Sequence, residues 1–289
     1  MNLGVSLEGD PRAETVDLLG VRLRLPASVR RFAPELADLL AGDGRAPRIE
    51  LDLDTGLDAG LDPGLDTGPD PGPDPGPGSG GAAATASLGE VLARLTEAVV
   101  RNSPMLCVHA AVVAGPRGSL VVPGHSGLGK TTLTAALIQA GFSYLSDEVL
   151  AIDRTTGEVA GFPRPLSLAP DVWPLLGLTE PAVAGEAERQ FQPGRFGAVA
   201  SPGPPGHRVS DIVLARRRAE PGTELRPGSP TEAVTALLTR AFNHYLDPQG
   251  SLTTAARVVR DAAIWQADYH DAPELAARLW QLGQVSDAK

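Results

Sequence analysis

Residues Gly124 to Thr131 of the sequence read GHSGLGKT. It matches G-x-x-x-x-G-K-[ST], the Walker A pattern of a P-loop, at every fixed position. An apolar strand pattern precedes it, and a helical pattern follows from Lys130. Glycines let backbone N–H groups converge on phosphate oxygens, and a helix N-terminus adds a positive partial charge. We expect a nucleotide-binding α/β fold; the alternative is a glycine-rich turn that holds no ligand.

The loop and the first turn of the helix contain the residues expected to bind the nucleotide. These are Gly124, His125, Ser126, Gly127, Leu128, Gly129, Lys130, Thr131 and Thr132. We expect Lys130 to reach the β- and γ-phosphates and Thr131 to ligate Mg²⁺. The chain has 25 Lys and Arg residues, of which only Lys130 and Lys289 are Lys, so Lys130 marks a position where a guanidinium cannot substitute. His125 is expected to face solvent rather than a substrate.

Two further features indicate chemistry beside the loop. Asp147 and Glu148 lie 17 and 18 residues after Lys130, within an apolar segment. Adjacent carboxylates are unfavourable there unless they serve a cation or a proton transfer. His109 lies 15 residues before Gly124, on a strand expected to form a hairpin with the P-loop strand. The plainer interpretations are a salt-bridged or capping acidic pair and a hydrogen-bonded core histidine.

Taken together, these residues resemble the HPr kinase/phosphorylase family and its shorter HPr-kinase-like relatives. The resemblance covers residues 88–168. Besides the loop, it rests on His109-Ala110-Ala111, on LIQAGFSYLSDE from Leu137 to Glu148, and on FPRPL from Phe162 to Leu166. It implies a mixed sheet with flanking helices, similar to the HPr kinase and PEP carboxykinase fold.

The resemblance also implies an activity, that of a serine kinase using ATP and Mg²⁺ on a peptide or small protein, such as a ribosomal peptide precursor. In that role Asp147 is the general base, Glu148 assists the metal or the base, and His109 tunes both carboxylates. HPr kinases form rings, so a homo-oligomer is compatible with it. Two other functions stay open: a nucleotide-binding scaffold or switch protein without kinase activity, and a small-molecule kinase.

Charge and composition exclude several classes of protein. The net charge is −10, and seven of those charges lie in one acidic tract between Asp52 and Asp74, which leaves −3 for the rest of the chain. A nucleic-acid binder would show a basic excess instead. The single cysteine, Cys107, excludes an internal disulfide framework. We find no signal peptide and no apolar run that could span a membrane, and therefore expect a cytoplasmic protein.

The chain is expected to have three parts: a small α/β segment at 1–52, an acidic disordered linker at 53–86, and a P-loop domain at 87–289. The linker repeats four-residue units such as LDPG, whose spacing matches neither an EF-hand calcium loop nor the Gly-Gly-x-Gly-x-Asp nonapeptide repeat. In the main domain we expect a capping box at Ser87, one strand over 144–152 and a mobile loop at 184–208. Helices are expected at 88–101, 130–140, 230–242, 253–261 and 273–283.

Overall fold

The computed structural model describes residues 14–25, 32, 34–40, 49–52, 87–124, 129–200 and 207–285. The acidic tract at 53–86 and the loop residues 125–128 lie outside this part of the chain, so the linker prediction is not tested by it.

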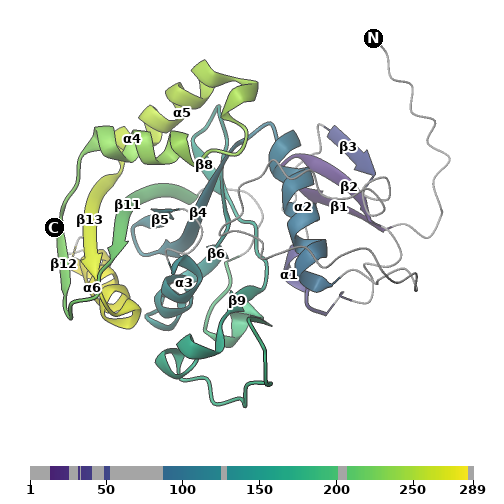
Figure 1. Cartoon of the computed structure of the whole chain (residues 1–289). Helices are drawn as coiled ribbons and strands as arrows, with labels where there is room; N and C mark the ends of the chain where they lie inside the picture. The colour runs from purple at the N-terminus through teal and green to yellow at the C-terminus, as the bar shows by residue number, and fades with distance from the viewer. Residues whose placement is uncertain are drawn as a thin grey trace, which may run out of the picture.

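In the described residues the main sheet has eight strands in the order β12-β13-β11-β5-β4-β7-β8, and β6 pairs with β4 (Figure 1). The strands are β4 (Leu106–Gly115), β5 (Gly118–Pro123), β6 (Ser143–Ser146), β7 (Val149–Ile152), β8 (Glu158–Ala160), β11 (His207–Arg217), β12 (Thr223–Pro227) and β13 (Ala263–Tyr269). Strands β5, β11 and β13 run parallel. Both β5 and β7 pair antiparallel with β4, so the sheet is mixed. The carboxyl ends of the three parallel strands therefore lie at one end of the sheet.

Helices cover both faces of this sheet. On one face lie α3 (Lys130–Gln139) and α6 (Ala272–Val285); on the other lie α4 (Pro230–Thr239) and α5 (Pro248–Asp261) (Figure 1). Alternation along β5 explains the two layers, because Leu120 and Val122 join the core with α3 and α6 while Val121 joins the core with α4 and α5. The expected fold class, a mixed sheet with flanking helices, is confirmed.

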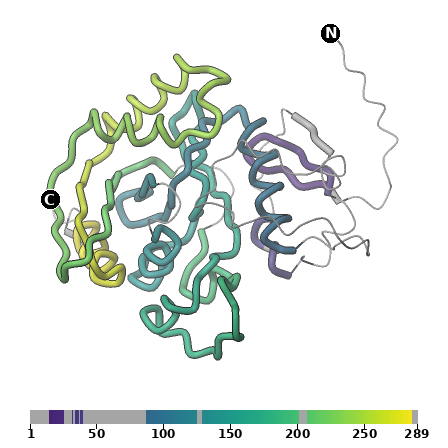
Figure 2. The backbone as a smooth tube through the Cα atoms, in the orientation of Figure 1, coloured from purple at the N-terminus to yellow at the C-terminus, as the bar shows by residue number. Residues whose placement is uncertain are grey.

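A second, smaller sheet comes from the start of the chain. It contains β1 (Glu14–Leu18), β2 (Val21–Leu25) and β3 (Ile49–Asp52), next to the short helix α1 (Ala37–Leu40). Helix α2 (Leu88–Asn102) packs between this sheet and the main one, in a single apolar core with β1, β2 and β4 (Figure 2). Its capping box is confirmed: Ser87 N–H donates to Glu90 Oε2 at 2.5 Å, and Glu90 N–H donates to Ser87 Oγ at 3.3 Å.

The segment 144–152 is not one strand, contrary to expectation. It forms β6 and β7, which pair one after the other with β4 and are separated by Asp147 and Glu148. The hydroxyl of Ser146 causes the break, because its Oγ accepts from the backbone N–H groups of Glu148 at 3.2 Å and Val149 at 2.9 Å. The acidic pair therefore lies in the bend between β6 and β7 rather than within a strand.

The predicted mobile loop at 184–208 is also wrong in its described part. Strand β10 (Arg189–Phe191) pairs with β9 (Leu166–Leu168), and β11 begins at His207. Phe191 packs edge-on against Trp173, with ring centroids 5.5 Å apart, and the Arg189 guanidinium lies 4.5 Å from the Trp173 ring. The residues in these contacts are far apart in the sequence, so the local composition of 184–208 does not predict them.

Two helix boundaries differ from expectation as well. Helix α4 ends at Thr239 rather than near 242, because Ala241 forms a β-bridge with Val108. Ser229 precedes α4 but makes no side-chain capping bond. Helix α5 begins at Pro248, five residues earlier than expected, where Asp247 caps it by accepting from Gly250 N–H at 2.9 Å.

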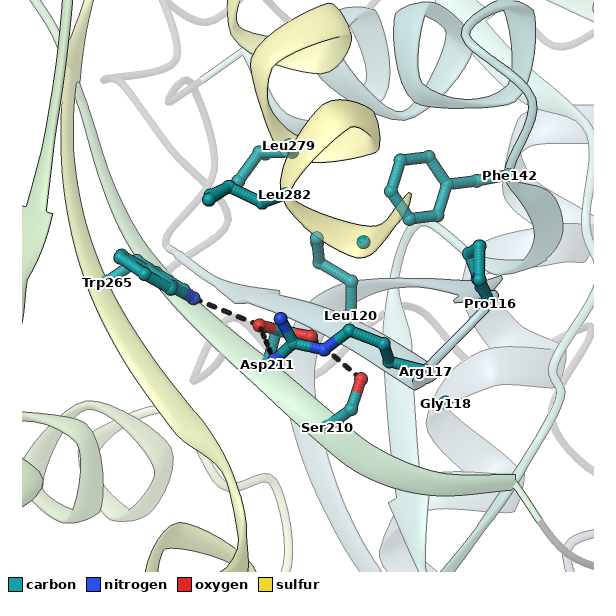
Figure 3. A pocket seen from close by; sticks show the side chains of 12 residues that line it. Pro116, Arg117, Gly118, Leu120, Phe142, Ser210, Asp211, Trp265, Leu279 and Leu282 are labelled. Carbon is teal, nitrogen blue, oxygen red and sulfur yellow. Dashed lines mark hydrogen bonds and ion pairs between the residues drawn. The ribbon is translucent and has the colours of Figure 1, made fainter. Parts of the chain in front are cut away.

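A polar cluster fastens the sheet at the end remote from the P-loop. Asp211 Oδ1 accepts from Arg117 Nη2 at 3.0 Å and from Trp265 Nε1 at 2.9 Å (Figure 3). The cluster thus joins the β4–β5 turn to β11 and β13. None of the helices in the described ranges is both long and apolar enough to cross a bilayer.

Candidate functional site

The described part of the P-loop connects β5 to α3 as the motif requires. Gly124 follows β5, and its N–H donates to the carbonyl of His109 at 3.3 Å. Gly129 has φ +78°, a left-handed conformation that favours glycine, and Lys130 then begins α3. His125, Ser126, Gly127 and Leu128 lie outside the described residues, so their predicted roles stay predictions.

Lys130 is buried, with 6% of its surface exposed. Burial lowers the pKa of its ammonium, the carboxylates Glu148 and Asp147 raise it, and the nearby Arg240 lowers it again. Thr131 and Thr132 follow in the first turn of α3, and both are half-buried. The cation thus lies within electrostatic reach of both predicted acidic residues.

Asp147 is the most enclosed carboxylate of this cluster, at 5% exposure. Thr131 Oγ1 donates to Asp147 Oδ2 at 3.1 Å. The single proton of the Tyr144 hydroxyl is shared between Asp147 Oδ1 at 3.1 Å and the carbonyl of Arg164 at 2.9 Å. Burial raises the pKa of the Asp147 carboxyl, while the Arg164 guanidinium and the two hydroxyl donors oppose that rise. The result is a buried carboxyl, more basic than an ordinary aspartate, tied directly to the first turn of α3.

His109 and Arg164 lie on either side of Glu148. His109 Nε2 is 3.5 Å from Glu148 Oε1, and Arg164 Nη1 is 3.9 Å from Glu148 Oε2. Arg164 also donates from Nη1 to Thr96 Oγ1 at 3.5 Å, and its buried Nε has no hydrogen-bond partner in the described part of the chain. The buried Nε–H of Arg164 is therefore a donor that an acceptor group entering the site could use.

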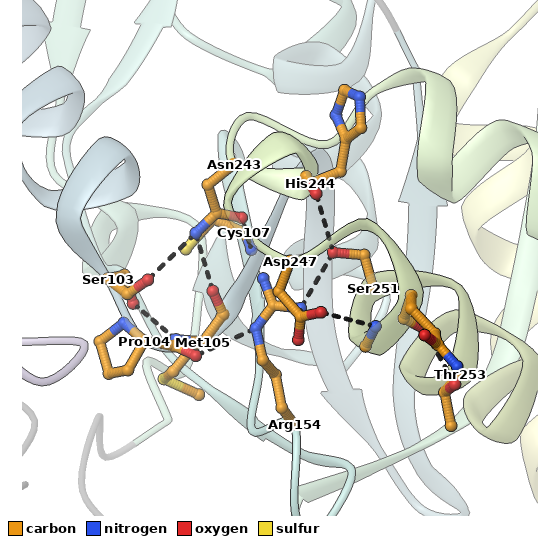
Figure 4. A network of polar contacts seen from close by, with 12 residues as sticks. Ser103, Pro104, Met105, Cys107, Arg154, Asn243, His244, Asp247, Ser251 and Thr253 are labelled. Atoms are coloured by element: carbon orange, nitrogen blue, oxygen red, sulfur yellow. Dashed lines mark hydrogen bonds and ion pairs between the residues drawn. The ribbon is translucent and has the colours of Figure 1, made fainter.

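The segment after α4 holds His109 in place. His109 N–H donates to the carbonyl of Arg240 at 2.8 Å, and the rings of His109 and Phe242 are 5.7 Å apart. Asn243, fully buried, accepts at Oδ1 from Cys107 N–H at 3.0 Å. Its Nδ2 donates to the carbonyls of Ser103 at 3.1 Å and Met105 at 2.8 Å (Figure 4). A C-terminal segment therefore sets the position of a side chain on β4.

The structure thus brings together Lys130, Thr131, Asp147, Glu148 and His109, which the sequence named as candidates. Three neighbours escaped sequence reasoning: Tyr144, Arg240 and Asn243. Tyr144 offers a weak signal, since a lone phenol three residues before Asp147 in an apolar strand needs a hydrogen-bond partner. Arg240 and Asn243 offer none, because more than 90 residues separate them from Asp147.

Comparison with solved structures gives several loose likenesses. The chain is similar to the solved HPr(Ser) kinase/phosphatase from Coxiella burnetii at 12% identity and a TM-score of 0.33, over 63% of this chain and 92% of that one. No family model and no curated protein matches the chain. Because the likeness is loose, it does not indicate a function by itself. The functional conclusion depends on the side chains of the site.

Proposed function

We propose that this protein is a kinase that transfers the γ-phosphoryl group of ATP to a serine hydroxyl of a peptide or small protein. The observation that carries the proposal is the hydrogen bond of 3.1 Å between Thr131, next to the P-loop lysine, and the buried carboxylate of Asp147. It supports placing a phosphate-binding cation and a carboxylate of raised pKa in one site. Phosphoryl transfer needs that combination, because it depends on positioning and charge neutralisation.

The roles follow from the geometry. Lys130 neutralises charge on the β- and γ-phosphates. Asp147 accepts the proton of the acceptor hydroxyl while the oxygen of that hydroxyl bonds to the γ-phosphorus. The bond between the γ-phosphorus and the bridging oxygen breaks at the same time, which releases ADP. Burial makes Asp147 a stronger base than an exposed aspartate. His109 and Arg164 hold Glu148 beside it.

The oxygen donors of the site fit Mg²⁺. The Thr131 hydroxyl and the carboxylates of Glu148 and Asp147 are hard ligands, of the kind that share this ion with substrate phosphates. Glu148 and Thr131 are the residues proposed to hold it, and bound Mg²⁺ supplies charge neutralisation on the phosphates.

The test is transfer of label from γ-labelled ATP. The full chain with Mg²⁺ is incubated with peptide, protein and metabolite fractions of the native host. We expect label on serine in a peptide or small protein. Asp147→Asn and Lys130→Ala should each reduce the rate by about 10²–10⁴, the usual contribution of a general base or a charge-stabilising group. Asp211→Asn, which changes a buried aspartate at the remote end of the sheet, serves as the matched control and should retain the rate.

Other outcomes distinguish the alternatives. Label in the metabolite fraction alone would establish a small-molecule kinase. Nucleotide binding without transfer to any fraction would establish a scaffold or switch protein. Full transfer by Asp147→Asn would remove the general-base assignment.

A further inference from the structure

A groove of about 440 Å³ lies beside the P-loop, on the face of the sheet covered by α4. Pro123, the last residue of β5, lines its end nearest the loop, and Gln266 and Asp268 of β13 line its far wall. Its volume is in the range of sites for small organic molecules. Neither the proposed catalytic residues nor the phosphate loop accounts for it.

The sheet order places this groove opposite the acidic pair. Strand β5 lies between β4 and β11. Asp147 and Glu148 lie on the side of β4, because β6 and β7 both pair with that strand. The groove lies on the side of β11 and β13, over the carboxyl ends of the parallel strands, where open α/β sheets bind ligands. A nucleotide whose terminal phosphate faces the acidic pair therefore directs its nucleoside toward the groove.

Helix α4 sets the length of the groove. Glu232, Ala236 and Arg240 line it at intervals of four residues. They share one face of the helix and span about 12 Å at 1.5 Å per residue. Arg240 lies at the end near the P-loop, since its carbonyl accepts from the N–H of His109, whose own carbonyl accepts from the N–H of Gly124. The groove thus extends from the phosphate-binding cation to the outer strands of the sheet.

The far wall is a fixed polar network. Arg226 Nε donates to Gln266 Oε1 at 3.0 Å, and Arg226 Nη1 donates to Asp268 Oδ2 at 3.0 Å. Gln266 Nε2 in turn donates to Glu232 Oε2 at 2.6 Å, which ties the wall to α4. Two anchors on one guanidinium fix the plane of Arg226, and a fixed guanidinium plane is a surface on which an aromatic base stacks.

Arg240 lines the end of the groove nearest the P-loop. Arg240 Nη1 donates to Ala236 O at 3.4 Å and to Thr239 Oγ1 at 3.2 Å, while its buried Nε has no hydrogen-bond partner in the described ranges. A half-buried guanidinium with an unused, buried N–H, close to a second cation, is stabilised when an anion binds between them.

We propose that this groove holds the base and ribose of the nucleotide, with the base stacked on Arg226 and Arg240 facing the α-phosphate. The inference rests on the proposed function only in taking Lys130 to bind the β- and γ-phosphates. It adds that the protein recognises a nucleoside, not phosphate alone, and that α4 forms one side of that recognition site.

The test is calorimetric titration of the full chain with two probes, Mg·ATP and Mg·tripolyphosphate. We expect ATP to bind at least tenfold more tightly than tripolyphosphate. Ala236→Leu keeps a good helix former but fills the groove. It should weaken ATP about tenfold and change tripolyphosphate less than twofold. Ala277→Leu, the same change at an exposed position on α6, should alter neither affinity.

Arg226→Ala is a second variant that leaves α4 intact, and it too should weaken ATP several-fold without affecting tripolyphosphate. Equal affinities of the wild-type protein for the two probes would overturn the groove assignment and leave the phosphate site standing. The groove assignment would also be overturned if both variants kept the ATP affinity of the wild-type protein but had a raised KM for the phosphate acceptor. That result would assign the groove to the acceptor. Absence of binding by both probes would overturn the proposed function and this inference together.

Discussion

At the scale of single residues, Asp147 couples the proposed chemistry to stability. Burial raises the pKa of its carboxyl, so the folded protein holds the proton more tightly than the unfolded chain does. The folded state is therefore favoured below the ordinary value of 3.8, and this contribution is lost as the pH rises through the raised pKa. At neutral pH the ionised carboxylate destabilises the fold.

Asp147→Asn should raise the Tm at pH 7 by about 2–4 °C, the shift that about 1 kcal/mol produces in a domain of this size. Asparagine carries no charge; its one oxygen can accept from either the Thr131 or the Tyr144 hydroxyl, and the other hydroxyl can rotate to accept from its amide N–H. Thermal unfolding at pH 7 and pH 4 checks this, and the difference should shrink at pH 4. Asp211→Asn should instead lower the Tm, because it leaves Arg117 without its ion pair. A lower Tm for Asp147→Asn at pH 7 would contradict the assignment.

Tyr144→Phe tests how the base is tuned. The hydroxyl of Tyr144 donates to Asp147 at 3.1 Å and lowers the pKa of that carboxyl. Its removal should move the acidic limb of the kcat/KM profile to higher pH and reduce stability by about 1 kcal/mol. The buried ring remains, so packing is preserved. An unchanged pH profile would show that this hydrogen bond does not act on the base.

The candidate site could be predicted in part because its central members belong to short motifs. Lys130 and Thr131 follow from the loop pattern, and Asp147 is conspicuous as a carboxylate among apolar neighbours. Tyr144 and Arg240 contribute through positions that only the fold creates. Arg240 reaches the vicinity of Lys130 because the segment after α4 pairs with β4, a contact between residues more than 130 positions apart.

At the scale of elements, the link between α4 and β4 depends on Asn243. Its side chain satisfies three buried backbone groups, those of Cys107, Ser103 and Met105. Asn243→Ala should reduce the free energy of unfolding by about 3 kcal/mol, since each buried polar group left unpaired costs about 1–3 kcal/mol. Urea denaturation measures it. Asn102→Ala, which removes a half-buried amide bonded to Ala98 O, should cost less than about 1 kcal/mol.

The end of α3 offers a separate test of packing. Gly141 has φ +120°, and a Cβ added there would lie 2.8 Å from the Trp280 ring. Gly177 has φ +68°, with open space around it. Gly177→Ala should therefore cost about 1 kcal/mol from backbone strain alone. Gly141→Ala should cost about 3 kcal/mol, since overpacking adds to the strain. Equal losses of stability for the two variants in thermal unfolding would show that the Trp280 ring moves aside for the added methyl group.

Elements with a local signal could be predicted, and elements defined by distant partners could not. The periodicity of 88–101 and the glycines around α3 fixed two helices within a residue or two. Strands β8, β10 and β12 are short, and each exists because a neighbouring strand offers its hydrogen bonds. The break between β6 and β7 depends on Ser146, whose effect on the backbone requires the three-dimensional turn.

At the scale of the whole molecule, the first sheet and the main sheet share one apolar core through α2. Val91, Leu92, Leu95 and Val99 are buried in that core. A chain of residues 87–289 loses β1, β2 and α1, and exposing large aliphatic side chains costs about 1.5–3 kcal/mol each. We expect it to aggregate or to unfold at a much lower temperature. A chain of residues 14–289 keeps every element that packs on α2 and should retain the Tm. Equal Tm values for the two would show that the cores are independent.

The scarcity of lysine has a practical consequence. A protease that cuts only after lysine has one internal cleavage site in the entire sequence, and that site is the buried first residue of α3. Cutting there requires the first turn of α3 to unwind. The rate at which fragments 1–130 and 131–289 appear therefore measures how often the phosphate site opens. A molecule that closes the site slows that one cut. The intensity of the two fragment bands on a gel therefore reports how much of the unlabelled protein has its phosphate site occupied.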